Sequence, residues 1–275
     1  MRRIIVAAAV MLLSLVGVQA TALPVAPEPA PAVTGIPEPC TSFHPFPDDA
    51  SINEIKKQFE ERFDFRVEGK LWTEEYRPSI KIVWETLDAV DCTTYRSVLQ
   101  KKQPNTIGLN AGHIRGYAWG DWSLTKPNAV SLDLEKFKGA IAADDEGRLV
   151  RLVIHELAHV YNSDRFESPD YWNDFVALHR KEGRFSDYAG RSVTETWADA
   201  VGYYVGRCAM ENPYDSGEHD AYYEFVKTRV FGGKEFGPEP GKPLDCSVPS
   251  PGAEEPHPGN HFVKLPNIIT DLTAE

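Results

Sequence analysis

The spacing of apolar residues changes from helical to strand-like and back again along this chain. Four apolar residues between positions 52 and 63 recur at intervals of three or four and predict a helix that begins near residue 51. The same spacing follows Pro78 in IKIVWETLDAV and resumes beyond Cys92 in YRSVLQKK. The first part of the chain is therefore predicted to be helical.

From residue 105 the pattern becomes alternating and glycine-punctuated, in TIGLNAG, GYAWGDWSL and AVSLDLEKF. These segments predict a small, mainly antiparallel sheet of about three strands. The helical pattern then returns in RLVIHELAHVY, SPDYWNDFVALHRKEG and VTETWADAVGYYVGRC. Upstream helices, a small sheet and further helices form an α+β order of elements, which we expect to fold as one domain over residues 51–235.

The two ends of the chain differ from this domain in composition. Two arginines, an apolar stretch and small residues give residues 1–22 the layout of a signal peptide, too short for a stable membrane span. Residues 23–50 form a proline-rich arm, and residues 236–275 a tail rich in proline and glycine. We therefore expect a secreted protein that has no membrane attachment once its signal is removed.

The charge and the cysteine content indicate which classes of partner and which cellular compartment to expect. Acidic residues outnumber basic ones by 41 to 29, which argues against nucleic acid or an anionic membrane as the main partner. None of the four cysteines is spaced as Cys-x-x-Cys, and an even number in an exported chain indicates two disulfides. Three connectivities are possible, of which we favour Cys40–Cys92 with Cys208–Cys246. We also expect the chain to be a monomer.

The segment VIHELAHVYNSD carries the first candidate chemistry. In a helix His155 and His159 lie one turn apart on the same face, so their imidazoles can fill two positions of a tetrahedral zinc. Glu156 is the next residue along the helix, in the general-base position of the H-E-x-x-H metalloprotease motif. The rest of the helix is apolar, so we expect this histidine face to be buried.

A catalytic zinc needs a third protein ligand. Asn162 and Arg165 stand where a metzincin has its glycine turn and its third ligand, so that arrangement fails. Further along, Glu195 and Asp199 lie one turn apart in SVTETWAD; one can bind the metal while the other accepts a hydrogen bond from a liganding histidine. Ser192-x-x-Glu195 also has the pattern of a helix capping box, and both interpretations can hold in part.

H-E-x-x-H followed by a helix with E-x-x-A-D resembles the gluzincin metallopeptidases. The resemblance is closest to the group typified by anthrax lethal factor and the minigluzincins. It extends over residues 80–207 as architecture, and by sequence only over the motifs themselves. It implies a zincin-like fold in which an active-site helix is followed by a glutamate helix.

The resemblance also implies roles for individual residues. His155, His159 and Glu195 would bind one zinc ion per chain, and Asp199 stands where the lethal-factor pattern has a glutamate that contacts a liganding histidine. In that group a tyrosine seven residues before the ligand glutamate assists catalysis, and Tyr188 occupies this position.

These patterns predict a secreted zinc peptidase that hydrolyses a protein or peptide substrate with Glu156 as general base. The extended substrate would pair with an edge strand of the small sheet. Tyr117, Trp119 and Trp122 belong to strand packing or to the lining of the cleft. Two alternatives share the site: a secreted binding protein with a zincin fold and no catalysis, and a zinc-dependent esterase or amidase.

Overall fold

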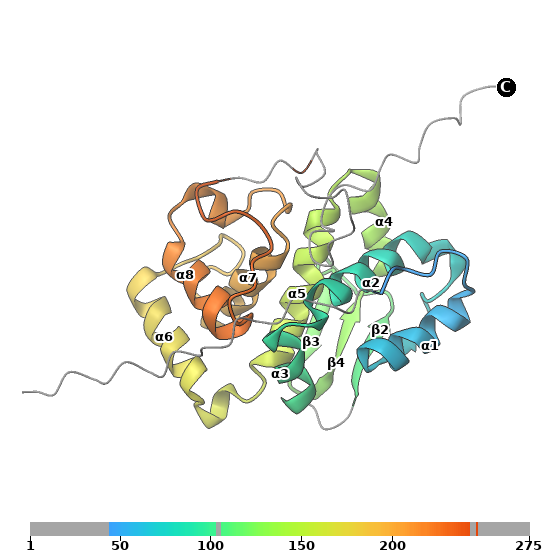
Figure 1. Cartoon of the computed structure of the whole chain (residues 1–275), viewed down its shortest axis with the longest axis horizontal. Coiled ribbons are helices and arrows are strands. Elements are labelled where there is room, and N and C mark those ends of the chain that lie inside the picture. Colours follow the sequence, from blue (N-terminus) through green and yellow to red (C-terminus); the bar gives the residue numbers. More distant parts are fainter. Residues whose placement is uncertain (1–43, 103–105, 243–245, 247–275) are drawn as a thin grey trace, which may run out of the picture. The chain divides into compact units, whose positions relative to one another are not determined.

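The computed structural model describes residues 44–102, 106–242 and 246 (Figure 1). Its α-helices are α1 (Ile52–Phe63), α2 (Arg77–Asp91), α3 (Thr94–Lys102), α4 (Leu134–Ala142), α5 (Glu146–Tyr161), α6 (Asp170–Glu182), α7 (Val193–Val205) and α8 (Asp220–Phe225). Its strands are β1 (Phe65–Gly69), β2 (Ile107–Ala111), β3 (Gly120–Ser123) and β4 (Lys126–Leu132). Short 3-10 turns at Glu74–Tyr76, Arg165–Glu167 and Pro213–Ser216 and a π-helical turn at Val226–Val230 complete these elements. The predicted signal peptide and most of the proline-rich arm lie outside the described residues.

The four strands form one mixed sheet in the order β1-β2-β4-β3. β1 pairs with β2 and β2 with β4 in parallel, while β3 pairs antiparallel to β4 at the edge. The α+β class is confirmed, but the prediction of a mainly antiparallel sheet is wrong. The sequence pattern missed β1, a strand of five residues directly after α1. Helices α2 and α3 form the long connection that parallel pairing of β1 with β2 requires.

The predicted helices are present, and one predicted strand is shorter than expected. AVSLDLEKF divides after Leu132, where β4 ends. The Asp133 side chain accepts a hydrogen bond from the backbone N–H of Lys136 at 3.4 Å and so caps α4. The second half of that segment is therefore helical.

Helix α5 lies at the centre of the described fold, against α7 on one side and against β3 and β4 on another (Figure 1). Almost all of its residues from Leu149 to Tyr161 are buried. Gly202 in α7 and Gly206 directly after it permit the close approach of the helices: a Cβ on either would lie 2.8 Å from atoms of Arg151. This approach sets the faces of α5 and α7 that carry the motif residues against each other.

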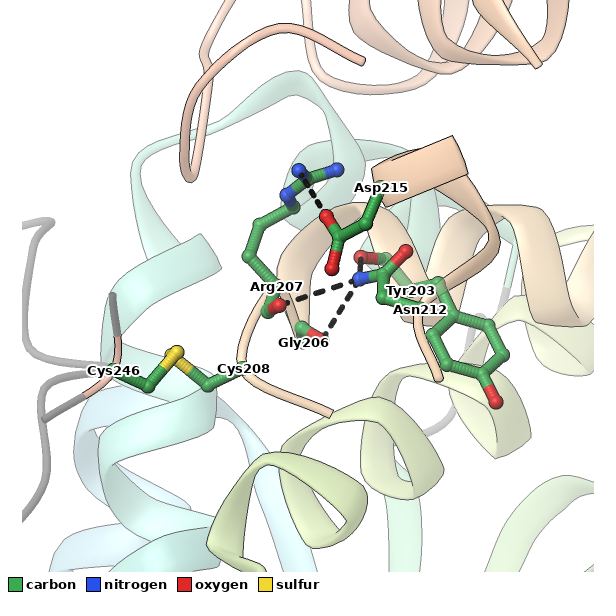
Figure 2. Close-up of a disulfide and its surroundings, with 7 residues drawn as sticks. All are labelled: Tyr203, Gly206, Arg207, Cys208, Asn212, Asp215 and Cys246. Carbon is green, nitrogen blue, oxygen red and sulfur yellow. Dashed lines mark hydrogen bonds and ion pairs between the residues drawn. A yellow bond between two sulfur atoms is a disulfide. The ribbon is translucent and has the colours of Figure 1, made fainter. Parts of the chain in front are cut away.

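The predicted disulfide between Cys208 and Cys246 is present (Figure 2). It joins the turn after α7 to a residue of the predicted C-terminal tail. Cys40 lies outside the described residues, so its pairing with Cys92 stays a prediction. None of the described cysteines is free.

Hydrogen bonds also hold the turn after α7 in place (Figure 2). The buried guanidinium of Arg207 donates to Asp215 at 3.0 Å, and the Asn212 amide donates to the backbone oxygen of Tyr203 at 3.1 Å. A Cβ on Gly147, at the start of α5, would lie 2.2 Å from the backbone of Cys208. The turn is thus packed directly on the first turn of α5.

In the part of the chain that the structure describes, no helix combines the length and the apolar character needed to cross a membrane.

Candidate metal centre

Helix α5 presents the two motif histidines side by side, as predicted. The ring centroids of His155 and His159 are 4.9 Å apart with nearly perpendicular planes. Both residues are buried. The helix brings them together because residues four apart share a face, and packing in the folded chain limits the contact of that face with bulk water.

Helix α7 brings Glu195 to these histidines. One carboxylate oxygen lies 3.3 Å from His155 Nε2, and the other lies 3.7 Å from His159 Nε2. One ligand atom from each of the three residues lies within 4.8 Å of the others, so they form a group that can hold a metal ion. Two imidazole nitrogens and one carboxylate are a donor set that suits zinc and leaves a fourth position open.

Glu195 also takes part in capping α7. Its backbone N–H donates to the Ser192 hydroxyl at 3.3 Å, so Ser192 is the N-cap of the helix. The Glu195 side chain does not return to the Ser192 backbone, because that N–H is bonded to the oxygen of Ala189. Both interpretations of this motif therefore hold in part: the backbone of Glu195 is capped, and its carboxylate faces the histidines.

Asp199 is fully buried and supports His155 from behind. One of its oxygens lies 2.9 Å from His155 Nδ1 and accepts a hydrogen bond from Arg151 at 2.6 Å. The other oxygen accepts from the hydroxyl of Ser186. A carboxylate at Nδ1 keeps a proton on that nitrogen and leaves Nε2, the nitrogen that faces Glu195, as the one that can bind a metal. The predicted contact between Asp199 and a histidine is therefore present.

The two histidines of the metal-ligand group differ in the direction in which their pKa is shifted. Hydrogen bonds from His155 and His159 hold the pKa of Glu195 well below its usual range. Burial lowers the pKa of His155, but its bonds to Asp199 and Glu195 outweigh this effect and raise the pKa to about 9. Among the described residues none places a carboxylate on the other nitrogen of His159, and burial lowers the pKa of this histidine.

Glu156 is buried beside the metal-ligand group without belonging to it. Its carboxylate packs on Gly120 at the start of β3: a Cβ built on this glycine would lie 2.5 Å from Glu156 Oε1. Burial raises the pKa of Glu156 to about 7. A carboxyl group with a pKa near neutrality can both accept and release a proton.

Tyr188 lies at the site, on the segment between α6 and α7. Its ring stands edge-on to His155, with centroids 5.8 Å apart, and 65% of the residue is exposed. Partial burial, followed by the nearby charges of Glu195 and Glu156, raises the pKa of its phenol, so the hydroxyl is a hydrogen-bond donor at neutral pH. Its role in catalysis stays a prediction.

A cleft of about 390 Å³ adjoins His155, Glu156 and Tyr188. Its other lining residues are Tyr117, Ala118, Trp119, Gly120, Arg148, Arg151, Leu152, Tyr203, Ala209, Met210 and Glu211. Two of the three aromatic residues considered from the sequence therefore line it. The third, Trp122, stacks on the ring of His159 at 5.7 Å instead.

Three residues of this site were not found by sequence reasoning: Gly120, Arg151 and Ser186. Arg151 had a signal, since it lies one turn before His155 on the same helix face. Gly120 and Ser186 lie on other elements and belong to no motif, so only the folded chain brings them to the site.

Comparison with known proteins finds no relative: no family model, no curated protein and no solved structure matches this chain.

Proposed function

We propose that this chain is a zinc-dependent peptidase. One observation carries the proposal: His155, His159 and Glu195 converge as a possible metal site, while Glu156 lies next to them outside the ligand group. A structural zinc is usually closed by four protein ligands, and a buried carboxylate beside three ligands has a use only if water reacts there.

Each residue has a defined task in this proposal. Zinc, when bound, supplies a Lewis acid that makes water a nucleophile near neutral pH and polarises a carbonyl group. Glu156 accepts the proton of the attacking water and delivers it to the leaving amine. Tyr188 donates a hydrogen bond to the oxygen that becomes negative during the attack. Asp199 holds His155 in the orientation and tautomer needed for binding.

The edge strand β3 supports a peptide as the substrate. Among the described strands it lies at the end of the order and pairs on one side only, so a peptide could add a further strand on its outer side. Gly120 at its start contacts Glu156, and Trp122 stacks on His159. An extended peptide paired with β3 would therefore run across both the proposed base and the metal ligands. We propose that the chain acts on such substrates as a monomer and binds no nucleic acid.

We further propose that the protein works outside the cytoplasm. The support is the disulfide Cys208–Cys246, because such bonds persist in oxidising compartments, together with the signal-peptide layout of residues 1–22.

Metal analysis combined with a cleavage assay tests the function. The purified protein should contain close to one zinc per chain, cleave unfolded casein, and lose this activity reversibly when a chelator removes the metal. Glu156→Gln is the matched control, because it should contain the same zinc and leave casein intact. Zinc without cleavage of casein would favour the binding-protein alternative, and cleavage of small esters alone would favour an esterase.

A further inference from the structure

The segment that carries Tyr188 is a tight turn closed by Ser186. The hydroxyl of Ser186 accepts a hydrogen bond from the backbone N–H of Ala189 at 3.0 Å. Its backbone oxygen accepts another from the N–H of Gly190 at 3.2 Å. Tyr188 therefore stands inside a turn in which both oxygens of Ser186 are hydrogen-bonded.

Tyr188 depends on this turn for its position. Because 65% of the residue is exposed, packing restrains the phenol ring weakly. The turn is anchored at both ends. Ala189 is buried on one side of Tyr188, and on the other side buried Phe185 packs against the rings of Tyr203 and Tyr214. The backbone of the turn thus decides where the phenol hydroxyl lies.

The same serine is fastened to the metal centre. Its hydroxyl donates to one oxygen of Asp199, whose other oxygen lies 2.9 Å from His155 Nδ1. One buried carboxylate is therefore shared by a histidine of the metal group and by the turn that carries the proposed oxyanion donor. The hydrogen bonds of Ser186 and His155 to Asp199 thus connect the turn before α7 with helix α5 through one buried carboxylate.

We propose that Ser186 is a positioning residue that fixes Tyr188 relative to His155 through Asp199. The catalytic part of this inference rests on the proposed peptidase function. Ser186 touches neither the metal ligands' Nε2 atoms nor the cleft, so its removal acts on turnover through Tyr188. If Ser186 only donated a hydrogen bond to Asp199, its removal would instead lower the zinc affinity through His155. A positioning role therefore predicts a loss of turnover, and a purely structural role predicts a loss of zinc affinity.

A double-mutant cycle separates these roles. In zinc-loaded protein, Tyr188→Phe should lower kcat about 10²-fold, as loss of one oxyanion donor does. Ser186→Ala should lower kcat about tenfold, since small displacements of reacting groups have effects of this order. In the Tyr188→Phe background the same serine change should alter kcat by less than about twofold, because the hydroxyl that Ser186 positions is already absent. Independent sites would instead show the full tenfold loss in both backgrounds, to within about twofold.

Three further measurements complete the test. Ser186→Thr, which retains a hydroxyl, should restore most of the turnover, and Asp187→Ala, an exposed neighbour in the same turn, should leave kcat unchanged. Zinc affinity and KM should stay near the wild-type values in Ser186→Ala. Equal losses of kcat in the wild-type and Tyr188→Phe backgrounds, or a fall in zinc affinity that matches the fall in kcat, would overturn the proposal.

Hydrogen exchange provides a readout that does not need activity. In zinc-loaded Ser186→Ala the amides of Ala189 and Gly190 should exchange faster than in the wild type, while Asp187→Ala should leave them protected. Unchanged exchange in Ser186→Ala would show that the serine does not hold the turn. A wild-type protein that binds zinc but cleaves no peptide would refute the peptidase, and the exchange rates would still decide the role of Ser186.

Discussion

Adding one methyl group at Gly120 is expected to disable the proposed base without removing the metal. In Gly120→Ala the new Cβ would lie 2.5 Å from Oε1, 2.7 Å from Cγ and 2.8 Å from Cδ of Glu156. Gly120 lies on β3, away from His155, His159 and Glu195 in the sequence, and it supplies no ligand atom. The three atoms nearest to the new Cβ therefore all belong to the side chain of Glu156.

The size of the effect follows from these distances. Ordinary van der Waals contact begins at 3.4 Å, so Oε1 must move by about 0.9 Å. A misplacement of about 1 Å at a reacting group can lower the rate about 10²-fold. Glu156 is buried and its Cγ also lies within 2.7 Å of the added Cβ, so overpacking should lower the free energy of unfolding by about 1–3 kcal/mol. Peptide turnover, zinc content and chemical unfolding of Gly120→Ala measure the three quantities.

Gly139→Ala is the matched control. Gly139 lies exposed on α4, where an added Cβ meets nothing within 4 Å. Alanine is favoured over glycine inside a helix by about 1 kcal/mol, so this variant should be slightly more stable and fully active. The reasoning fails if zinc-loaded Gly120→Ala keeps turnover within about tenfold of the wild type, because a displaced general base forfeits more than that.

The remaining predictions concern the proposed base, the metal ligands, the cysteines and one partly buried acid. Glu156→Gln should keep its zinc and lose about 10²–10⁴-fold in turnover; activity within about tenfold would contradict its role as base. In competition with a chelator, Glu195→Ala should fail to hold zinc, while Asp199→Asn should bind it about 10–100-fold more weakly; the opposite order would exchange their roles. Thiol titration of the unfolded, unreduced mature protein should find no free thiol, and two or more would contradict the disulfides. Burial raises the pKa of Glu85 from 4.5 to about 7, so the folded chain binds this proton more tightly than the unfolded chain. Its stabilising effect should be complete below pH 4.5 and decline as the pH rises through 7, and chemical unfolding of Glu85→Gln should lack this decline.

The parts of the site that could be predicted from the sequence are pairs of residues that lie within the same helix. The spacing of His155 and His159, and that of Glu195 and Asp199, fixes a shared face wherever a helix forms. That the two faces meet depends on the packing of α5 on α7, which spacing alone does not determine. The resemblance to gluzincins suggested this meeting, and the distances between Glu195 and the histidines agree with it.

The sheet shows why the rest could not be predicted. The FRVEG segment of β1 is short, and its pairing with β2 is decided by contacts with residues about forty positions away. Short segments separated by glycine suggest that each strand pairs with the next one in the sequence. In the structure, β4 instead lies between β2 and β3. Gly120 and Ser186 share this limitation, because each matters through an atom contributed by a distant element.

The approach of Glu195 to His155 and His159 has a consequence for the lifetime of the protein. A metal held by these three residues would cross-link α5 to α7 reversibly, much as a disulfide does permanently. Binding that occurs only in the folded state adds about 2.7 kcal/mol at a free metal concentration one hundred times the dissociation constant. The surrounding zinc concentration would then decide how long the folded protein resists unfolding and degradation, so that the ion proposed to activate this protein would also set how long it lasts.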